Sequence, residues 1–372
     1  MTPRPTEMPR VGAVLESQDS STMWRVQQPM KFLSRFGYQV EWVMGDDPAF
    51  LQLAAEVDMM ILPRLMWKDP KREDVFFGLL RDFNCLAVFE TDDDIWSMKP
   101  YFLSAMPKHQ QELWPSTASR LRRSSKRCQG MTVTTAPLLA KALAGHIGDH
   151  PIEVIPNLID MEWWDALLAV TDRQYEGLTI GWAGGRRNLK DLDVMFEAWG
   201  IIAKKYDHVT FLQAGSPLQE ELAEHVPTDR FEYIPWAPLW EYPAVCKQFD
   251  IGCAPLTENL FNECKSPIKV MEYAAAGAAA VASETVYSFH FDEDDGGILL
   301  ADTVEEWVEH LSDLIENEDF RLARAERLRE EVYMKHSLQK RSHKWVDAWF
   351  RLYASMLRKR PVKIETAGAL RH

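Results

Sequence analysis

Residues Phe261–Ser283 read FNECKSPIKVMEYAAAGAAAVAS, which divides into a polar loop, a short helix, a glycine stop and a strand of small residues. Ser266 is a favoured N-cap, and Pro267 suits the first helical position because its missing N–H would have no partner there. Apolar residues then repeat at helical spacing up to Gly277, which favours a helix end. The predicted helix begins with free backbone N–H groups and a positive dipole end, which suit a phosphate.

Charged side chains surround the start of this predicted helix. Lys265 and Lys269 lie on either side of Ile268, and Glu272 follows about a turn and a half into the helix, at about 3.6 residues per turn. Its carboxylate could accept hydrogen bonds from the hydroxyl groups of a sugar. A phosphate at the helix start and a ribose beside the helix together describe a nucleotide site. An ordinary helix with solvated lysines and a solvated glutamate is the alternative.

The rest of the chain alternates short apolar strands with helices. The predicted strands of the first half are Val11–Leu15, Tyr38–Val43, Val57–Leu62, Cys85–Glu90, Met131–Thr134 and Ile152–Ile155. Those of the second half are Leu178–Ala183, Val209–Gln213, Phe231–Ile234 and Ile251–Ala254, with the small-residue strand after them. This alternation predicts two α/β halves with parallel, doubly wound sheets, at residues 1–165 and 166–335. A last helix and a tail are expected at residues 336–372.

Length and composition agree with a two-domain protein, because 372 residues are many for one domain. The net charge of −14 argues against generic nucleic-acid binding but leaves room for a local basic surface. Five scattered cysteines without a C-x-x-C pair predict reduced thiols in a cytosolic setting. No apolar run approaches the ~18 residues that span a bilayer, so we expect a cytoplasmic protein whose membrane contacts, where it has them, are peripheral.

Three further segments extend the pattern of the opening stretch. They are IPNLID at Ile155–Asp160, GWAGGRRNLKDL at Gly181–Leu192 and FDIGCAPL at Phe249–Leu256. In this order and spacing, the four segments resemble the retaining nucleotide-sugar glycosyltransferases of the family-4 (group 1) type. The resemblance implies the GT-B fold, in which two Rossmann-like domains face a cleft and the C-terminal helix crosses back onto the first domain. The first domain would then face the acceptor, and the second would bind the donor.

The activity that the resemblance implies is transfer of a sugar from a UDP- or GDP-sugar to an acceptor hydroxyl. It implies retention of configuration and neither a metal nor another cofactor. The acceptor stays open between a lipid-linked glycan, a polysaccharide, a protein and a modified DNA base, and so does the oligomeric state. Two other functions also stay open, namely a nucleotide-sugar epimerase of the same fold and a non-catalytic nucleotide-sugar-binding protein.

A glycine-bearing loop after the predicted strand Leu178–Ala183 is the next candidate. Gly184 and Gly185 let the backbone approach a ligand closely, and three cations follow at Arg186, Arg187 and Lys190. The resemblance implies that an arginine and a lysine of this loop stabilise the leaving diphosphate. Arg186 and Lys190 are therefore the catalytic candidates, with Arg187 binding the donor. A charged helix start with ordinary surface cations is the alternative.

The resemblance also assigns roles near the predicted donor helix. Glu272 matches the glutamate that holds the donor ribose. The family often carries a first glutamate eight positions earlier, and here Cys264 stands at that position with Glu263 beside it. Trp236 lies where the family places the donor base, although a tryptophan of the core would fit the sequence equally well.

In the first half, the run ETDDDIW at Glu90–Trp96 follows an apolar strand. Its acids should lie at the carboxyl end of a parallel sheet, where open α/β sheets bind ligands. Asp92, Asp93 and Asp94 are therefore candidates to orient the acceptor hydroxyl or to take its proton. A helix N-cap cluster is one alternative, and a D-x-D metal site is another.

Basic residues supply the remaining candidates. Arg25 and Arg64 lie near strand-to-helix junctions and could face the acceptor. The runs Ser119–Arg127 and Leu357–Lys363 are basic in an acidic chain. A solvated helix face explains them best, and contact with an acidic acceptor such as a lipid phosphate or nucleic acid is the alternative.

Overall fold

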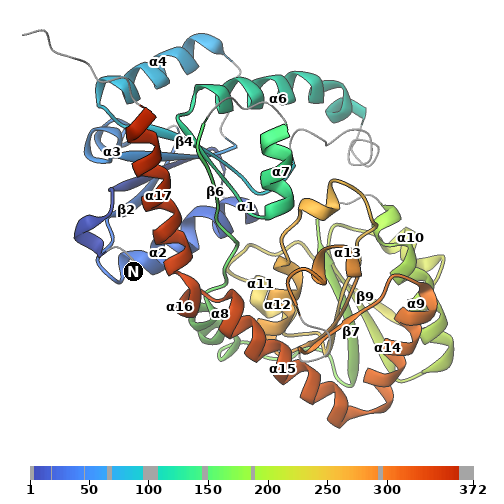
Figure 1. Ribbon diagram of the computed structural model, residues 1–372. Coiled ribbons are helices and arrows are strands. Elements are labelled where there is room, and N and C mark those ends of the chain that lie inside the picture. Colours follow the sequence, from blue (N-terminus) through green and yellow to red (C-terminus); the bar gives the residue numbers. More distant parts are fainter. Residues whose placement is uncertain are drawn as a thin grey trace, which may run out of the picture.

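The computed structural model describes residues 4–17, 19–45, 47–64, 69–94, 108–144, 150–185, 189–291 and 296–359. Figure 1 shows two α/β domains, one built before and one after the helix α8 (Met161–Leu168). The expected domain boundary at residue 165 falls inside this helix, which packs against helices of the second domain. Along the described residues, every helix is too short or too polar to cross a membrane.

The first domain is built on a parallel six-stranded sheet in the order β2-β1-β3-β4-β5-β6. Its strands are β1 (Val11–Leu15), β2 (Val40–Met44), β3 (Met59–Pro63), β4 (Leu86–Thr91), β5 (Gly130–Val133) and β6 (Ile152–Val154). The connecting elements are η1 (Pro5–Glu7), α1 (Ser20–Thr22), η2 (Met23–Gln27), α2 (Gln28–Ser34), α3 (Phe50–Glu56), α4 (Pro70–Asp82), α6 (Lys108–Arg127) and α7 (Ala136–Ala144). β1, β3 and β4 are buried along their whole length, because helices cover both faces of the sheet.

The second domain repeats this plan, with a parallel sheet in the order β12-β11-β10-β7-β8-β9. Its strands are β7 (Leu178–Gly184), β8 (Val209–Gly215), β9 (Phe231–Pro235), β10 (Ile251–Ala254), β11 (Ala279–Ala282) and β12 (Ile298–Leu300). The connecting elements are η3 (Leu189–Asp191), α9 (Asp193–Lys205), α10 (Gln219–Ala223), α11 (Tyr242–Cys246), η4 (Asn262–Cys264), α12 (Ile268–Ala276), α13 (Glu284–Tyr287) and α14 (Val304–Glu316). The two sheets confirm the predicted pair of doubly wound α/β domains.

The C-terminal helices join the domains. α15 (Glu318–His336) packs on α12 and β11 of the second domain, and α16 (Leu338–Arg341) leads to α17 (His343–Lys359) on β5 and β6 of the first. Trp345, Trp349 and Leu352 of α17 lie in the same buried cluster as Val11 and Leu15. The predicted return of the last helix to the first domain is therefore confirmed.

Helix α12 (Ile268–Ala276) differs from its prediction at one end. Gly277 ends it in the left-handed conformation, with φ 84°, as predicted. The expected N-cap at Ser266 is wrong, because the helix begins at Ile268 and Pro267 is its N-cap, without a side-chain cap. Pro267 has ψ 34°, outside the helical range, so the helix starts one residue later than the sequence indicated.

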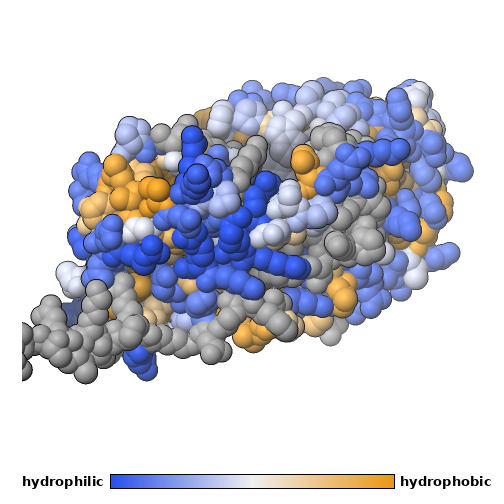
Figure 2. Space-filling view, turned by 90° about the horizontal axis from the view of Figure 1, so that it is seen from above, coloured by the Kyte–Doolittle hydropathy of each residue, from blue (hydrophilic) through white to orange (hydrophobic). Residues whose placement is uncertain are grey.

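The two basic runs occupy different positions. Ser119–Arg127 belongs to α6, where Arg123 pairs with Glu73, and Arg127 with Asp74 at 2.5 Å. Figure 2 views the molecule from above, at right angles to the view of Figure 1, and shows hydrophilic side chains gathered in the middle of the face that is visible there. These ion pairs favour the solvated-face interpretation of α6. The second run, Leu357–Lys363, lies partly outside the described residues.

Candidate active site

A pocket lies between the two domains at the carboxyl ends of their strands. Of the predicted site residues, the ones that line it are Asp92, Asp93, Gly184, Gly185, Trp236, Lys265, Ser266, Ile268, Lys269 and Glu272. Ser21, Trp24, Gly215 and Tyr242 also line it, and the sequence did not single them out. Both domains therefore contribute to one pocket, in which the start of α12 faces the acid run of the first domain.

Two glycines of the second domain, Gly184 and Gly215, line the pocket. A Cβ on Gly184 would lie 2.7 Å from the ring of Trp182 and 3.0 Å from Lys269 Nζ. Gly215 has φ 97°, and a Cβ there would lie 2.3 Å from the carbonyl oxygen of Gly184. Neither position has room for a side chain, because neighbouring groups of the second domain fill the space, so packing within this domain requires glycine at both.

Of the three cations predicted in the glycine loop, the structure describes only Lys190. Arg186 and Arg187 lie outside the described residues. Lys190 is exposed and does not line the pocket; its carbonyl accepts a hydrogen bond from Thr257 Oγ1 at 2.8 Å. The expected role of Lys190 beside the diphosphate therefore has no support from this geometry.

Glu272 and Tyr242 form a hydrogen-bonded pair in the pocket. Glu272 is only 7% exposed, and Tyr242 Oη donates to its Oε2 at 3.0 Å. Burial raises the pKa of Tyr242 well above its ordinary value, so the phenol stays protonated and remains a donor at neutral pH. Nothing local in the sequence marks Tyr242, because the pairing joins positions 30 residues apart.

Lysines lie on both sides of the start of α12. Lys265 Nζ lies 4.5 Å from the centroid of the Phe261 ring and 3.1 Å from Asp93 Oδ1 of the first domain. Lys269 Nζ donates to the carbonyl of Ala183 and lies 5.5 Å from the centroid of the Trp182 ring. Both cations therefore line the pocket beside the start of α12.

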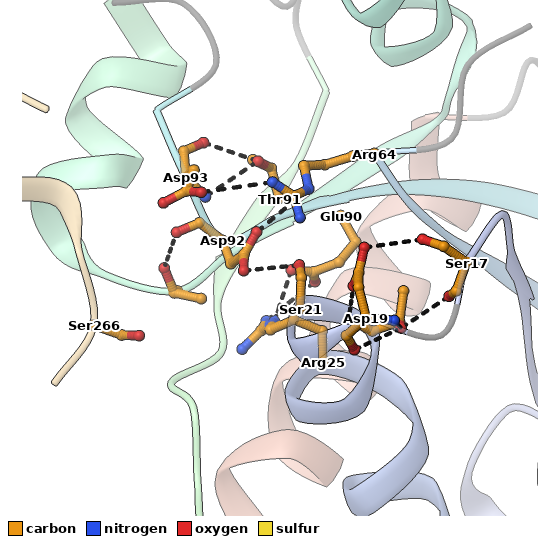
Figure 3. A network of polar contacts seen from close by, with 12 residues as sticks. Ser17, Asp19, Ser21, Arg25, Arg64, Glu90, Thr91, Asp92, Asp93 and Ser266 are labelled. Carbon is orange, nitrogen blue, oxygen red and sulfur yellow. Dashed lines mark hydrogen bonds and ion pairs between the residues drawn. The ribbon is translucent and has the colours of Figure 1, made fainter. Parts of the chain in front are cut away.

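The acid run at the end of β4 is held by a small polar network, which Figure 3 shows from close by. Ser21 Oγ donates to Asp92 Oδ2 at 2.8 Å. Arg64 lies 3.5 Å from Asp92 Oδ1 and 3.5 Å from Asp93 Oδ2. Its backbone has φ 45°, which is uncommon for a residue with a side chain. Asp92 raises the pKa of Arg64, so this arginine holds the two carboxylates in place as a cation.

Asp94 and Arg25 are not where the sequence analysis expected them. Asp94 is fully buried and does not line the pocket. Arg25 is 1% exposed, so it cannot contact an acceptor; it donates to Glu90 at 2.7 and 3.1 Å and stacks 4.7 Å from the centroid of the Trp345 ring. Burial raises the pKa of Glu90, and the neighbouring guanidinium opposes that effect.

The loop before α12 docks into the first domain. Phe261 and Cys264 belong to the hydrophobic cluster of that domain, and Thr135 Oγ1 donates to the Cys264 carbonyl at 2.9 Å. Burial raises the pKa of the Cys264 thiol to about 12. The position that carries a glutamate in the resembling family therefore holds a buried, neutral side chain.

The D-x-D alternative concerns a metal site at the acid run. In the part of the chain that the structure describes, no three or more His, Cys, Asp and Glu side chains gather as a metal site would require. The carboxylates of Asp92 and Asp93 face the guanidinium of Arg64 instead.

The domain arrangement is that of the GT-B fold, and known proteins share it. Residues 177–317 match the family described as Glycosyl transferases group 1. An α-glucosyltransferase in complex with UDP-glucose and DNA containing an abasic site has a TM-score of 0.68 at 12% identity, covering 91% of this chain and 98% of that one. Sucrose-phosphate synthase from Thermosynechococcus elongatus has a TM-score of 0.61 at 12% identity, with 92% and 99% covered.

Anabaena HepE in complex with UDP-glucose is similar to the chain over nearly its whole length. Its TM-score is 0.58 at 12% identity, and 95% of this chain and 100% of that chain are covered. No curated protein sequence matches the chain. At these identities the structural likeness establishes the fold, and the function has to be argued from the site.

Proposed function

We propose that this protein is a glycosyltransferase that moves a sugar from a nucleoside diphosphate sugar to an acceptor hydroxyl. The observation that carries the proposal is the set of groups around the start of α12. Lys265, Ser266, Lys269 and Glu272 all line one pocket, which the first domain closes from the other side. Residues 177–317, which contain this set, also match the group 1 glycosyltransferase family.

The leaving diphosphate is assigned to the start of α12. The first N–H groups of the helix and its dipole favour an anion there, and Lys265 and Lys269 add two positive charges beside it. Preorganised donors of this kind stabilise negative charge that develops on a leaving group. The proposed transfer is therefore independent of a metal, and we propose retention of configuration by analogy with the family.

The ribose of the donor is assigned to Glu272. A carboxylate offers about four lone-pair positions, and the hydroxyl of Tyr242 accounts for one of them. The donor base is assigned to Trp236, whose ring is 63% exposed and lies 3.8 Å from a Cβ built on Gly185. UDP-glucose is the first donor to test, because it is bound in two of the structural neighbours, and GDP-sugars are the second.

The acceptor is assigned to the side of Asp92 and Asp93. Both carboxylates line the pocket opposite α12, so one of them can orient an acceptor hydroxyl or take its proton during transfer. On this assignment the acceptor enters from the first domain. The acceptor experiments described below test its chemical class.

A thermal-shift screen against UDP- and GDP-sugars tests the donor. A ligand at ~100 times its dissociation constant should stabilise the protein by roughly 2.7 kcal/mol. Incubation of the bound donor with lipid-linked, polysaccharide, protein and modified-DNA acceptors then tests transfer. If no nucleotide sugar shifts the unfolding temperature, the proposed function fails.

A non-catalytic nucleotide-sugar-binding protein is the second candidate, and the buried Cys264 favours it. This neutral thiol replaces a carboxylate that the resembling family places at the site. Product analysis separates the candidates. A binding protein leaves the donor intact with every acceptor, and an epimerase yields a new nucleotide sugar with no acceptor present.

A further inference from the structure

One hydrogen bond ties the start of the donor helix to the segment between β6 and α8. Asn157 Nδ2 donates to Ser266 Oγ at 2.7 Å. Asn157 is 2% exposed, whereas Ser266 lines the pocket immediately before the first turn of α12. A buried amide therefore contacts a side chain that faces the proposed diphosphate position.

The orientation of this amide follows from its other neighbour. Arg25 Nη1 donates to Asn157 Oδ1 at 3.0 Å. A guanidinium has no acceptor, so the amide oxygen must face Arg25 and the NH₂ group must face Ser266. Arg25 is held in turn by the two oxygens of Glu90 at 2.7 and 3.1 Å and by the Ile155 carbonyl at 2.6 Å. Reversing the amide would place its NH₂ group against a guanidinium N–H group that the ion pair with Glu90 holds in place.

This orientation determines what the Ser266 hydroxyl can do. Its oxygen accepts from Asn157, so its own proton must point elsewhere. The hydroxyl does not cap α12, and within the described part of the chain no oxygen accepts its proton. The directions that remain include the pocket, where Lys265 and Lys269 also converge.

We propose that Asn157 is a positioning residue that aims the Ser266 O–H at an anionic oxygen of the donor diphosphate. The inference rests on the proposed function, because it concerns the same diphosphate. It explains why Arg25, Glu90 and Asn157 are buried together although none of them lines the pocket. Their network fixes the direction of one hydrogen-bond donor at the ligand.

The test exchanges the amide for a carboxylate. In Asn157→Asp, the carboxylate can still accept a hydrogen bond from Arg25. It has no N–H to donate to Ser266, so the serine hydroxyl must donate to the carboxylate instead, and its proton turns away from the pocket. We expect Asn157→Asp and Ser266→Ala each to weaken UDP binding by about 10-fold or more, as for the loss of a hydrogen bond to a charged group. Calorimetry with UDP and with uridine, which lacks the phosphates, measures this, and uridine affinity should stay the same.

A double-mutant cycle separates the hydrogen bond from the added charge. If Asn157 acts through Ser266, UDP binding by the double variant should be close to that of Ser266→Ala alone, because the effects do not add. Asn317→Asp is the matched control. Asn317 is exposed and caps α15 far from the pocket, so this variant adds the same charge and should bind UDP like the wild type.

The outcomes have distinct meanings. The inference would be overturned, while the proposed function stands, by either of two results. One is an Asn157→Asp variant that binds UDP normally, and the other is a double variant whose fold loss of UDP affinity is the product of the two single losses. A wild-type protein that binds neither UDP nor GDP would overturn the proposed function and the inference together. If Asn157→Asp does not fold, Asn157→Ser is the substitute, because it removes the amide without adding charge. It should weaken UDP binding in the wild-type protein but cause no further loss of UDP affinity in a protein that already carries Ser266→Ala.

Discussion

Lys265 Nζ lies 3.1 Å from Asp93 Oδ1, and this ion pair joins the donor-side loop to the acid run of the opposite domain. Both side chains line the pocket and are partly exposed, at 20% and 26%. A diphosphate at the start of α12 would compete with Asp93 for the same ammonium group. If the diphosphate binds there as proposed, the pair would couple donor binding to the contact between the domains.

The first prediction concerns this competition. Asp93→Asn should strengthen UDP binding about 1.5- to 5-fold, the range expected for a partly exposed pair worth about 0.2–1 kcal/mol. Raised salt should shrink the gain. Calorimetry measures the affinity, and Asp74→Asn is the control, because Asp74 pairs with Arg127 on α6, away from the pocket. Unchanged or weaker binding by Asp93→Asn would show that the ion pair does not oppose the donor.

The second prediction concerns the ribose. Glu272→Ala should weaken UDP binding roughly 10- to 150-fold without unfolding the protein, because hydrogen bonds to a charged group contribute about 1.5–3 kcal/mol. Glu263→Ala is the matched control, because Glu263 precedes α12 and does not line the pocket. Equal affinities of the two variants in calorimetry would remove Glu272 from the donor site.

Local patterns in the sequence were sufficient for the fold and for part of this site. Buried strands such as Met59–Pro63 read as apolar runs, and Gly277 marks a helix end because few other residues adopt its φ. Glu272 lines the pocket together with the start of α12, because helical spacing fixes its distance from the helix start. These features depend on neighbours within a few positions.

The features that the sequence analysis missed depend on distant partners. Arg25 finds Glu90 65 positions away, and that ion pair draws it out of the pocket into the core. Ser266 does not cap α12 but accepts from Asn157, 109 positions away. Cys264 is buried because its loop docks into the other domain. No local pattern encodes such pairings, because they arise only when segments distant in the sequence come together, within one domain for Arg25 and Glu90 and between the domains for Ser266 and Cys264.

The third prediction concerns metals. Transfer should survive treatment with EDTA, because Lys265 and Lys269 supply positive charge at the proposed diphosphate position. The measurement is the transfer rate before and after chelation. Loss of activity that manganese restores would contradict it and would support the D-x-D alternative for Asp92 and Asp94.

The fourth prediction concerns pH and two neighbouring histidines, His290 after α13 and His336 at the end of α15. Burial lowers the pKa of both His290 and His336 to about 4, from about 6.5 in the unfolded chain. Between these values the unfolded chain binds protons that the folded protein does not, so stability is complete above about pH 6.5 and falls toward pH 4. Ordinary carboxylates titrate mostly at the acid end of this window. At about 1.4 kcal/mol per pKa unit, the loss should be up to about 3 kcal/mol per histidine.

Unfolding midpoints measured against pH test this prediction. The double variant His290→Gln and His336→Gln should flatten the fall between pH 6.5 and 4. His208→Gln is the control, because the His208 side chain is 59% exposed and should leave the curve unchanged. A double variant with the wild-type slope would show that other groups cause the fall.

The fifth prediction concerns the acid run. Asp92 lines the pocket, accepts from Ser21 and faces Arg64, so its carboxylate is fixed opposite the donor helix. If it takes or orients the acceptor proton, Asp92→Asn should cut transfer by roughly two orders of magnitude or more and leave UDP affinity intact. Loss of a helix cap would cost only ~1 kcal/mol of stability, and asparagine remains a good cap, so a purely structural role predicts a small effect.

Asp94→Asn supplies the matched comparison for Asp92→Asn. Asp94 is two positions away in the same run but is buried outside the pocket. Its amide variant should therefore keep the transfer rate once folded, whatever it does to stability. The measurement is the transfer rate at saturating donor, with calorimetry of UDP on each variant. If Asp92→Asn and Asp93→Asn both transfer sugar at near wild-type rates, the acid run has a structural role, and the base must be sought elsewhere along the first-domain wall of the pocket, where Ser21 is the next polar group.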